Sequence, residues 1–317
     1  MKRGLLLCCL AMGLLAGNTA SAAKIFIPMD VEGQTNHIKA YGVAFAALKL
    51  GVSVDWLLNY KGGSFGMDQV EIMERMCKLR GVSYQIVSDA QYGGMLNEIT
   101  NPDFNGDIIK LEKPPKVGVY TPPNKEPWDD AVTLVLTYAE IPFDKLYDDE
   151  LLADNLAKYD WLHLHHEDFT GQYGKFFHFR DYPWYRAQKR EAEEIASKWG
   201  FSKVSQLKLA VAKKVQQYVA GGGYMFAMCN ATDTYDVALA TQNTDIADVI
   251  YDGDPTDPSA QKKLDFSQTF AFQNFQVSVL RFRADLFGLK PSPDTTRQTR
   301  GQCGEGMDSP QQFLNIP

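Results

Sequence analysis

The chain contains little cysteine. Only five of its 317 residues are cysteine, and Cys8 and Cys9 lie within the first 22 residues. The other three, Cys77, Cys229 and Cys303, are an odd number, so at least one of them forms no disulfide within the chain. The disulfide framework of small secreted domains is therefore excluded, and stability must come from a conventional hydrophobic core.

The sequence also lacks a long apolar run and an excess of positive charge. After the first 22 residues, no segment approaches the roughly 20 apolar residues that a membrane-spanning helix needs. The formal net charge is −7, and it becomes −9 once Lys2 and Arg3 are removed with the first 22 residues. We therefore expect no transmembrane segment and no nucleic-acid partner.

The first 22 residues have the pattern of an export signal. Lys2 and Arg3 supply the positive start, residues 5–15 are mostly apolar, and residues 20–22 are the small residues of a cleavage site. We expect cleavage after Ala22, leaving 295 residues in the periplasm or outside the cell. The expected partner is then an unknown small molecule or a component of the cell envelope.

Strand-like and helix-like segments alternate through most of the sequence, which indicates an α/β fold with mainly parallel sheets. The expected strands are 24–29, 52–58, 83–87, 108–111, 116–120, 143–146, 159–164, 224–228, 247–251 and 269–280. The expected helices are 35–50, 67–80, 94–99, 129–139, 185–198 and 204–219, with another opening near residue 233.

Pro114 and Pro115 mark the best internal boundary, because two consecutive prolines interrupt a helix or a strand ladder. This predicts two Rossmann-like halves, an N-terminal one at 23–113 and a second α/β domain at 116–290. Residues 291–317 are polar and contain glycine and proline, so we predict a disordered tail there.

The segment GGGYMFAMCNATDT, residues 221–234, predicts a strand, a sharp turn and a helix. Three glycines end one helical pattern, a short apolar strand follows, and Cys229 stands where that strand stops. A nucleophile on such a turn needs small neighbours because the backbone is sharply bent. Ala227 and Ala231 meet this requirement, so we expect Cys229 at a nucleophile elbow.

The second half resembles the class I glutamine amidotransferase-like fold, in which YVAGGGY (218–224) precedes a strand that ends in cysteine. Nearly the whole mature chain is similar to a family of secreted bacterial proteins often labelled asparagine synthetase B. The phrases that carry this similarity are QTNHIKAYG (34–42), VDWLLNYKGGSF (54–65), WDDAVTLVLTYAEIPFD (128–144), YDWLHLHHEDFTGQYGKF (159–176) and KLDFSQTFAFQNF (263–275). The resemblance implies a flavodoxin-like topology for the second domain.

The resemblance also implies chemistry at the elbow. The similar amidotransferases use the elbow cysteine as nucleophile, the following backbone N–H as part of an oxyanion hole, and a later His–Glu pair as the base. It therefore implies Cys229 as nucleophile and Asn230 as oxyanion donor. The chain departs from the pattern because its last histidine is His178. The competing interpretation is a structural cysteine that packs as a small hydrophobe.

The synthetase label fits the residues less well. Asparagine synthetases of that type resemble an amino-terminal cysteine glutaminase joined to an ATP-pyrophosphatase domain with an SGGxDS loop. Here residues 62–64 read GGS but Phe65 follows, and no cysteine stands at the expected mature start. We therefore treat asparagine synthetase activity as the disfavoured alternative.

The run HLHHED, residues 163–168, is the densest group of ionisable side chains. It ends an expected strand whose carboxyl end should share a rim with the elbow, and ligands of open α/β sheets gather at that rim. His165 or His166 could then act as the base for the elbow thiol, with Glu167 or Asp168 orienting the ring. A polar loop whose histidines bond backbone carbonyls is the alternative.

This chemistry requires no cofactor, and two metal sites are weaker alternatives. His163, His165 and Asp168 could hold zinc, because imidazole and carboxylate groups are zinc ligands. The acidic loop 252–257 could hold calcium, although it lacks the later glutamate of an EF-hand. A solvated turn is the favoured interpretation of that loop.

The sequence therefore favours an exported, cysteine-dependent amidase, hydrolase or transferase that acts on an amide or acyl group. The alternatives are a non-catalytic binding component of an envelope assembly and a metal-dependent hydrolase. The aromatic stretch 176–185 is a candidate partner surface, because exposed aromatic side chains mark contacts.

Overall fold

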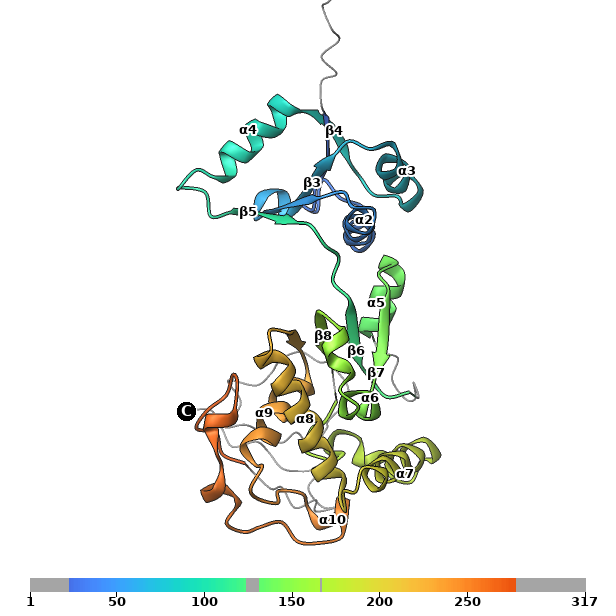
Figure 1. Ribbon diagram of the computed structural model, residues 1–317, viewed down its shortest axis with the longest axis vertical. Coiled ribbons are helices and arrows are strands. Elements are labelled where there is room, and N and C mark those ends of the chain that lie inside the picture. Colours follow the sequence, from blue (N-terminus) through green and yellow to red (C-terminus); the bar gives the residue numbers. More distant parts are fainter. Residues whose placement is uncertain (1–22, 124–130, 166, 278–317) are drawn as a thin grey trace, which may run out of the picture. The chain divides into compact units, whose positions relative to one another are not determined.

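The computed structural model describes residues 23–123, 131–165 and 167–277. The chain divides into two compact units between Pro114 and Pro115, and the first unit also includes Thr137–Ile141 (Figure 1). The expected export signal, the expected tail and His166 lie outside the described residues. Within the described ranges, no helix is both long and apolar enough to cross a bilayer.

The first unit contains a five-stranded antiparallel sheet in the order β4-β1-β3-β2-β5. Its elements are β1 (Ala23–Ile27), α2 (His37–Lys49), β2 (Val54–Leu58), β3 (Ser64–Asp68), α3 (Glu71–Arg80), β4 (Gln85–Ser88), α4 (Asp89–Ile99) and β5 (Asp107–Leu111). One core forms between the sheet and helices α2 and α3, and includes Ile25, Val43 and Met73. A second core joins Phe26 and Leu57 to α4.

The prediction of a Rossmann-like first half is wrong. The sequence interpretation missed β3 and started the following helix at residue 67, whereas α3 begins at Glu71. A short turn joins β2 to β3, and Asn59, Lys61, Gly62 and Gly63 all have positive φ in it. So short a connection permits only antiparallel pairing, because a parallel pair needs a crossover of about a dozen residues.

The second unit contains a four-stranded parallel sheet in the order β7-β6-β8-β9, which confirms the parallel sheet expected for this half. Its strands are β6 (Val117–Tyr120), β7 (Phe143–Leu146), β8 (Trp161–Leu164) and β9 (Tyr224–Ala227). Its helices are α5 (Ala131–Ala139, whose last turn belongs to the first unit), α6 (Asp148–Leu152), α7 (Pro183–Lys198), α8 (Val204–Ala220), α9 (Asn230–Ala240) and α10 (Val249–Asp252).

Short 3₁₀ helices occupy Tyr60–Gly62, Asn155–Lys158, Gly174–Phe179, Ala260–Lys263 and Phe266–Gln268. Two expected strands of the second unit are wrong. Residues 249–252 form α10, because the Asp248 side chain accepts a hydrogen bond from Ile250 N–H and caps a helical turn. Of the expected strand 269–280, residues 269–277 contain only a single bridge residue, Gln276, and residues 278–280 lie outside the described residues.

The core of the second unit lies between one face of the parallel sheet and helices α6, α8 and α9. Leu162 and Leu164 of β8 pack with Val211 of α8 and Tyr235 of α9. Alternate residues of a strand point to opposite faces, so His163 points away from this core. Strands β8 and β9 are parallel neighbours, so their carboxyl ends lie together, beside the start of α9.

A buried ionic network crosses this core. The Lys208 ammonium lies 2.9 Å from both Asp148 oxygens, and it donates to the hydroxyl groups of Tyr120 (2.9 Å) and Tyr147 (3.3 Å). Lys208 and Asp148 are almost completely buried. Burial raises the pKa of Tyr120 well above its usual value, and the Asp148 carboxylate raises it further.

Replacement of Lys208 tests how far the second unit depends on this network. Lys208→Met should lower the free energy of unfolding by about 3–5 kcal/mol, because Asp148 would be left as an uncompensated buried charge. Lys214→Met on the same helix is the matched control, since its 2.6 Å ion pair with Asp154 is exposed and is worth about 0–1 kcal/mol. Urea unfolding at pH 7 measures both, and equal losses would contradict the prediction.

Candidate functional site

The backbone at Cys229 forms a sharp turn between β9 and α9. Cys229 is the N-cap residue of α9 and has φ 55° and ψ −136°. A residue with a side chain rarely adopts this conformation, which costs on the order of 1–3 kcal/mol and persists only where the surroundings enforce it. The predicted order of strand, sharp turn and helix is therefore present around Cys229.

Hydrogen bonds to the end of β8 hold this turn in place. Met228 N–H donates to the Leu164 carbonyl at 3.0 Å, and Ala231 N–H donates to the His165 carbonyl at 3.3 Å. Ala231 is fully buried, which explains why a small residue follows the cysteine at this spacing. The same bonds place His165 beside the elbow.

The backbone N–H of Asn230 is suited to bind a negatively charged atom. Asn230 is the first residue of α9, where a backbone N–H has no partner within the helix. Within the part of the chain that the structure describes, this N–H makes no hydrogen bond. An unsatisfied donor directly after a nucleophile is suited to stabilise an oxyanion.

The two described histidines of the 163–168 run differ in their surroundings. His163 is buried on the outer face of β8, where its ring stacks on Phe226 with centroids 5.5 Å apart. His165 is half-buried at the rim, with its ring centroid 6.2 Å from that of His163. His165 is thus the described candidate for the base.

Glu167 and Asp168 are adjacent in sequence but differ in burial: Glu167 is buried and Asp168 is half-buried. Glu167 is buried, and burial together with the Asp148 and Glu167 carboxylates raises the pKa of Tyr147 well above its usual value. Asp168 Oδ1 accepts hydrogen bonds from Thr170 N–H (2.7 Å), the Thr170 hydroxyl (2.6 Å) and Gly171 N–H (2.9 Å). Asp168 therefore caps the turn after β8.

Asp233, which the sequence interpretation did not include among the site residues, lies in the first turn of α9. A carboxylate at this position normally has a lowered pKa, because the helix amino terminus favours negative charge. Here burial raises the pKa of Asp233 to about 6, and the Asp168 charge adds to the increase. The only signal for Asp233 in the sequence is its position four residues after Cys229.

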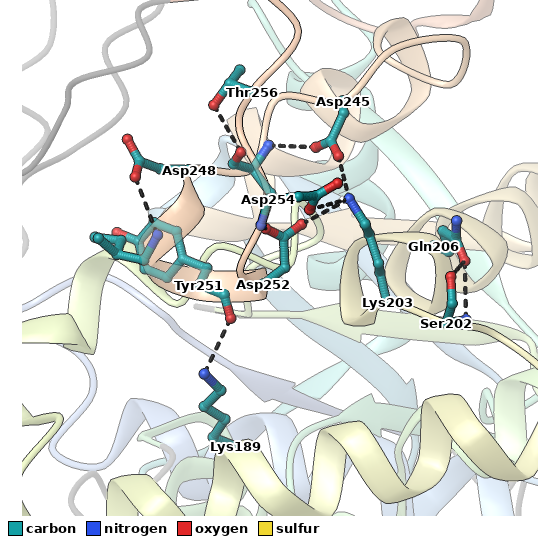
Figure 2. Close-up of polar contacts among 12 residues, drawn as sticks. Lys189, Ser202, Lys203, Gln206, Asp245, Asp248, Tyr251, Asp252, Asp254 and Thr256 are labelled. Atoms are coloured by element: carbon teal, nitrogen blue, oxygen red, sulfur yellow. Dashed lines mark hydrogen bonds and ion pairs between the residues drawn. The ribbon is translucent and has the colours of Figure 1, made fainter.

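The structure does not bring His163, His165 and Asp168 together as a zinc site. Among the described residues, the one group with ligand atoms close enough for a metal is Asp245, Asp252 and Asp254. The Lys203 ammonium already lies among these three carboxylates, at 2.5, 3.2 and 2.5 Å respectively (Figure 2).

Lys203 gives the acidic loop a structural explanation. Burial acts to lower the pKa of Lys203, but the three carboxylates outweigh it and raise that pKa. Asp257, the last acidic residue of the loop, pairs with Lys263 at 2.5 Å. The carboxylates of the expected calcium loop are therefore neutralised by lysines.

The aromatic stretch 176–185 packs partly into the second unit. Phe177 is buried with its ring 5.2 Å from that of Tyr251, and Tyr185 is buried against Tyr173. Tyr182 is exposed.

A cavity of about 510 Å³ lies elsewhere, at the amino ends of β8 and β9, where Tyr159, Tyr218 and residues 221–223 line it. It is therefore at the opposite strand ends from Cys229.

The two cysteines among the described residues, Cys77 and Cys229, form no disulfide. Cys77 is fully buried, and burial raises the pKa of its thiol to about 11.

Comparison with protein-family models, curated proteins and solved structures finds no match to this chain. Its function must therefore be inferred from the elbow.

The strain at the elbow can be measured with two substitutions of one residue. Cys229→Gly should be more stable than Cys229→Ala by about 1 kcal/mol, because only glycine adopts a positive φ without steric cost. In an ordinary helix or strand the order is the reverse, with alanine favoured by roughly 0.5–1 kcal/mol. Urea unfolding of the two variants gives the difference, and an alanine variant that is the more stable would exclude the strained turn.

The raised pKa of Asp233 predicts a pH-dependent stability. The folded-state pKa of about 6 exceeds the unfolded value of roughly 3.9, so ionisation of Asp233 destabilises the fold progressively as the pH rises from 4 to 6. Asp233→Asn should therefore stabilise the protein by about 1–2 kcal/mol at pH 7 and have no effect near pH 3.5. Thermal unfolding across this range is the measurement. Asp103→Asn, at an exposed position of the first unit, is the control and should show no such trend.

Proposed function

We propose that the protein is an exported, cysteine-dependent enzyme that hydrolyses or transfers an amide or related acyl group at Cys229. The observation that supports this most directly is the strained backbone of Cys229, followed by the unsatisfied N–H of Asn230. A cysteine that only filled space in the core would need neither feature. Strained residues cluster at functional sites, where the surrounding structure enforces them.

The arrangement of the second unit supports the proposed amidotransferase-like topology. Its four parallel strands follow the order β7-β6-β8-β9, and the elbow stands at the carboxyl end of β9. In open α/β sheets, ligands bind at the carboxyl ends of the strands. Both observations suit an enzyme of this class, although the first unit has no Rossmann-like sheet.

In the proposed reaction, the Cys229 sulfur attacks the carbonyl carbon and forms a carbon–sulfur bond. His165 accepts the thiol proton, and the electron pair of the carbonyl double bond moves to an oxyanion that the Asn230 N–H stabilises. The oxyanion then re-forms the carbonyl and expels the leaving group. Water or another acceptor attacks the thioester and releases the acyl group, and the proton held by His165 returns to the Cys229 sulfur as it leaves. No cofactor is needed. His166 is a second candidate base, and Glu167 would orient the base.

A binding component of an envelope assembly is the second candidate function, and one observation favours it. Tyr224, Phe226 and Met228 of the edge strand β9 and the turn that follows are 60%, 45% and 38% exposed. Aromatic side chains exposed in a row mark contact surfaces. This function would not require a reactive thiol at Cys229, and therefore thiol chemistry distinguishes the two proposals.

Alkylation tests the proposed function without knowledge of the substrate. The mature protein carrying Cys303→Ser should react with iodoacetamide at Cys229 at pH 6.5, below the free-cysteine pKa of about 8.5. Cys77 is the internal control, because its buried thiol with a pKa of about 11 should not react while the protein is folded. Mass spectrometry of peptides measures both sites.

His165→Ala provides the second arm of this experiment. It should slow alkylation of Cys229 at pH 6.5 if the imidazole accepts the thiol proton. Labelling of Cys229 no faster than a small-molecule thiol in the parent protein, together with no effect of His165→Ala, would favour the binding function.

A further inference from the structure

We propose that Asp233 is the general acid of this site and donates the proton that the leaving amine needs. The inference rests on the proposed function, because it assigns a second proton-transfer group to the same elbow. His165 would remove the thiol proton, whereas Asp233 would supply a proton to the departing nitrogen. The base would then come from the segment after β8 and the acid from the first turn of α9.

The position of Asp233 follows from hydrogen bonds on either side of it. The single proton of the Thr234 hydroxyl is shared between two carbonyl oxygens, that of Asn230 at 2.7 Å and that of Glu167 at 3.2 Å. The same hydroxyl accepts a hydrogen bond from Phe169 N–H at 3.3 Å. These bonds fasten the loop on both sides of Asp168 to the first turn of α9. Asp233, which immediately precedes Thr234, is therefore fixed beside Asp168 and one turn beyond Cys229.

The charges around Asp233 favour its protonated form. Neither Asp168 nor Asp233 forms an ion pair with a lysine or arginine of the described residues. Burial is the main cause that raises the pKa of Asp233, and the Asp168 charge adds a smaller increase. The Thr234 N–H bonds Asp233 Oδ1 at 3.0 Å, which holds the carboxyl group in one orientation.

Other titratable groups lie around the pair on neighbouring elements. Burial raises the pKa of Tyr251, and Tyr185, Asp168 and Asp248 raise it further, so these groups share one environment. Lys189 on α7 donates to the Tyr251 carbonyl at 3.1 Å. The titratable groups shown near Asp168 are thus Tyr185 on α7 and Asp248 and Tyr251 at α10, while the His165 carbonyl bonds the first turn of α9 through Ala231 N–H.

A carboxyl group with a pKa near 6 is suited to general acid catalysis close to neutral pH. In the tetrahedral intermediate, the Asp233 proton passes to the nitrogen, the carbon–nitrogen bond breaks, and its electron pair leaves with the amine. The oxyanion returns its electrons to the carbonyl, which leaves a thioester on Cys229 and an ionised Asp233. The water that hydrolyses the thioester then restores the proton to Asp233.

Two acetyl donors that differ only in their leaving group test this assignment. 4-Nitrophenolate leaves 4-nitrophenyl acetate as a stable anion and needs no proton, whereas the amine of 4-nitroacetanilide must be protonated. Asp233→Asn should slow acetylation of Cys229 by the anilide by about 100-fold or more and leave acetylation by the ester unchanged. Release of the coloured product and mass spectrometry of Cys229 are the readouts, with Asp103→Asn as the matched control.

Each other result decides against the assignment. An equal loss with both donors would mean that Asp233 only maintains the structure, and no loss with either would mean that it has no role. If the ester but not the anilide acetylates the parent protein, Asp233 does not act as a general acid, and only the role of Cys229 as acyl acceptor is supported. Acetylation by neither donor would overturn the proposed function and this inference together.

Asp168→Asn supplies a second variant that retains the turn after β8, because the asparagine oxygen can still accept the bonds from Thr170 and Gly171. It removes the charge that favours the protonated form of Asp233. The fall in anilide acetylation with rising pH should therefore move to lower pH in this variant, while the ester profile stays in place. An unchanged anilide profile would contradict the coupling of Asp168 to Asp233.

Discussion

Hydrogen bonds between the end of β8 and the first turn of α9 are the interactions on which the site depends. Ala231 N–H bonds the His165 carbonyl, and the Thr234 hydroxyl bridges the backbone on both sides of Asp168. Without these bonds, Cys229 would relax from its strained backbone conformation, which costs on the order of 1–3 kcal/mol. The same hydrogen bonds also position the rim residues, so they maintain both the strained backbone of Cys229 and the geometry of the site.

Among the residues of the second unit that the structure describes, several acidic groups are paired with lysines, whereas Asp168 and Asp233 are not. The buried Asp148 pairs with Lys208, and Lys203 neutralises the three carboxylates near α10 (Figure 2). Those ion pairs join helices to loops. Asp168 and Asp233 have no such lysine among the described residues, and burial, together with the smaller effect of the Asp168 charge, raises the pKa of Asp233 to about 6. The same residue type therefore serves structure at one place and can serve chemistry at another.

Sequence patterns predicted the parallel sheet and the elbow because both depend on local features: strand–helix alternation, glycines that end a helix, and small residues around a cysteine. β3 was missed because a short strand containing Gly66 resembles a loop; a Cβ at Gly66 would lie 2.0 Å from the Tyr92 hydroxyl, a contact made in three dimensions. Residues 249–252 were mistaken for a strand because the cap by Asp248 outweighed their apolar character. Asp233 was not predicted because its raised pKa comes mainly from burial in the fold, with a smaller contribution from Asp168, which lies 65 positions earlier in the sequence.

The lack of a histidine after Cys229 is a weaker argument against catalysis than it first appears from the sequence. The rim of a parallel sheet is assembled from separate segments, and the proposed base, which follows β8, precedes the proposed nucleophile, which follows β9, although the two strands are neighbours in the sheet. Unrelated enzymes place the same catalytic groups in different chain orders, so geometry is the criterion. The geometry here includes a half-buried His165, an unsatisfied Asn230 N–H and a thiol held where glycine would be less strained. A cysteine that served only packing would gain nothing from that position, whereas a nucleophile gains access to the rim.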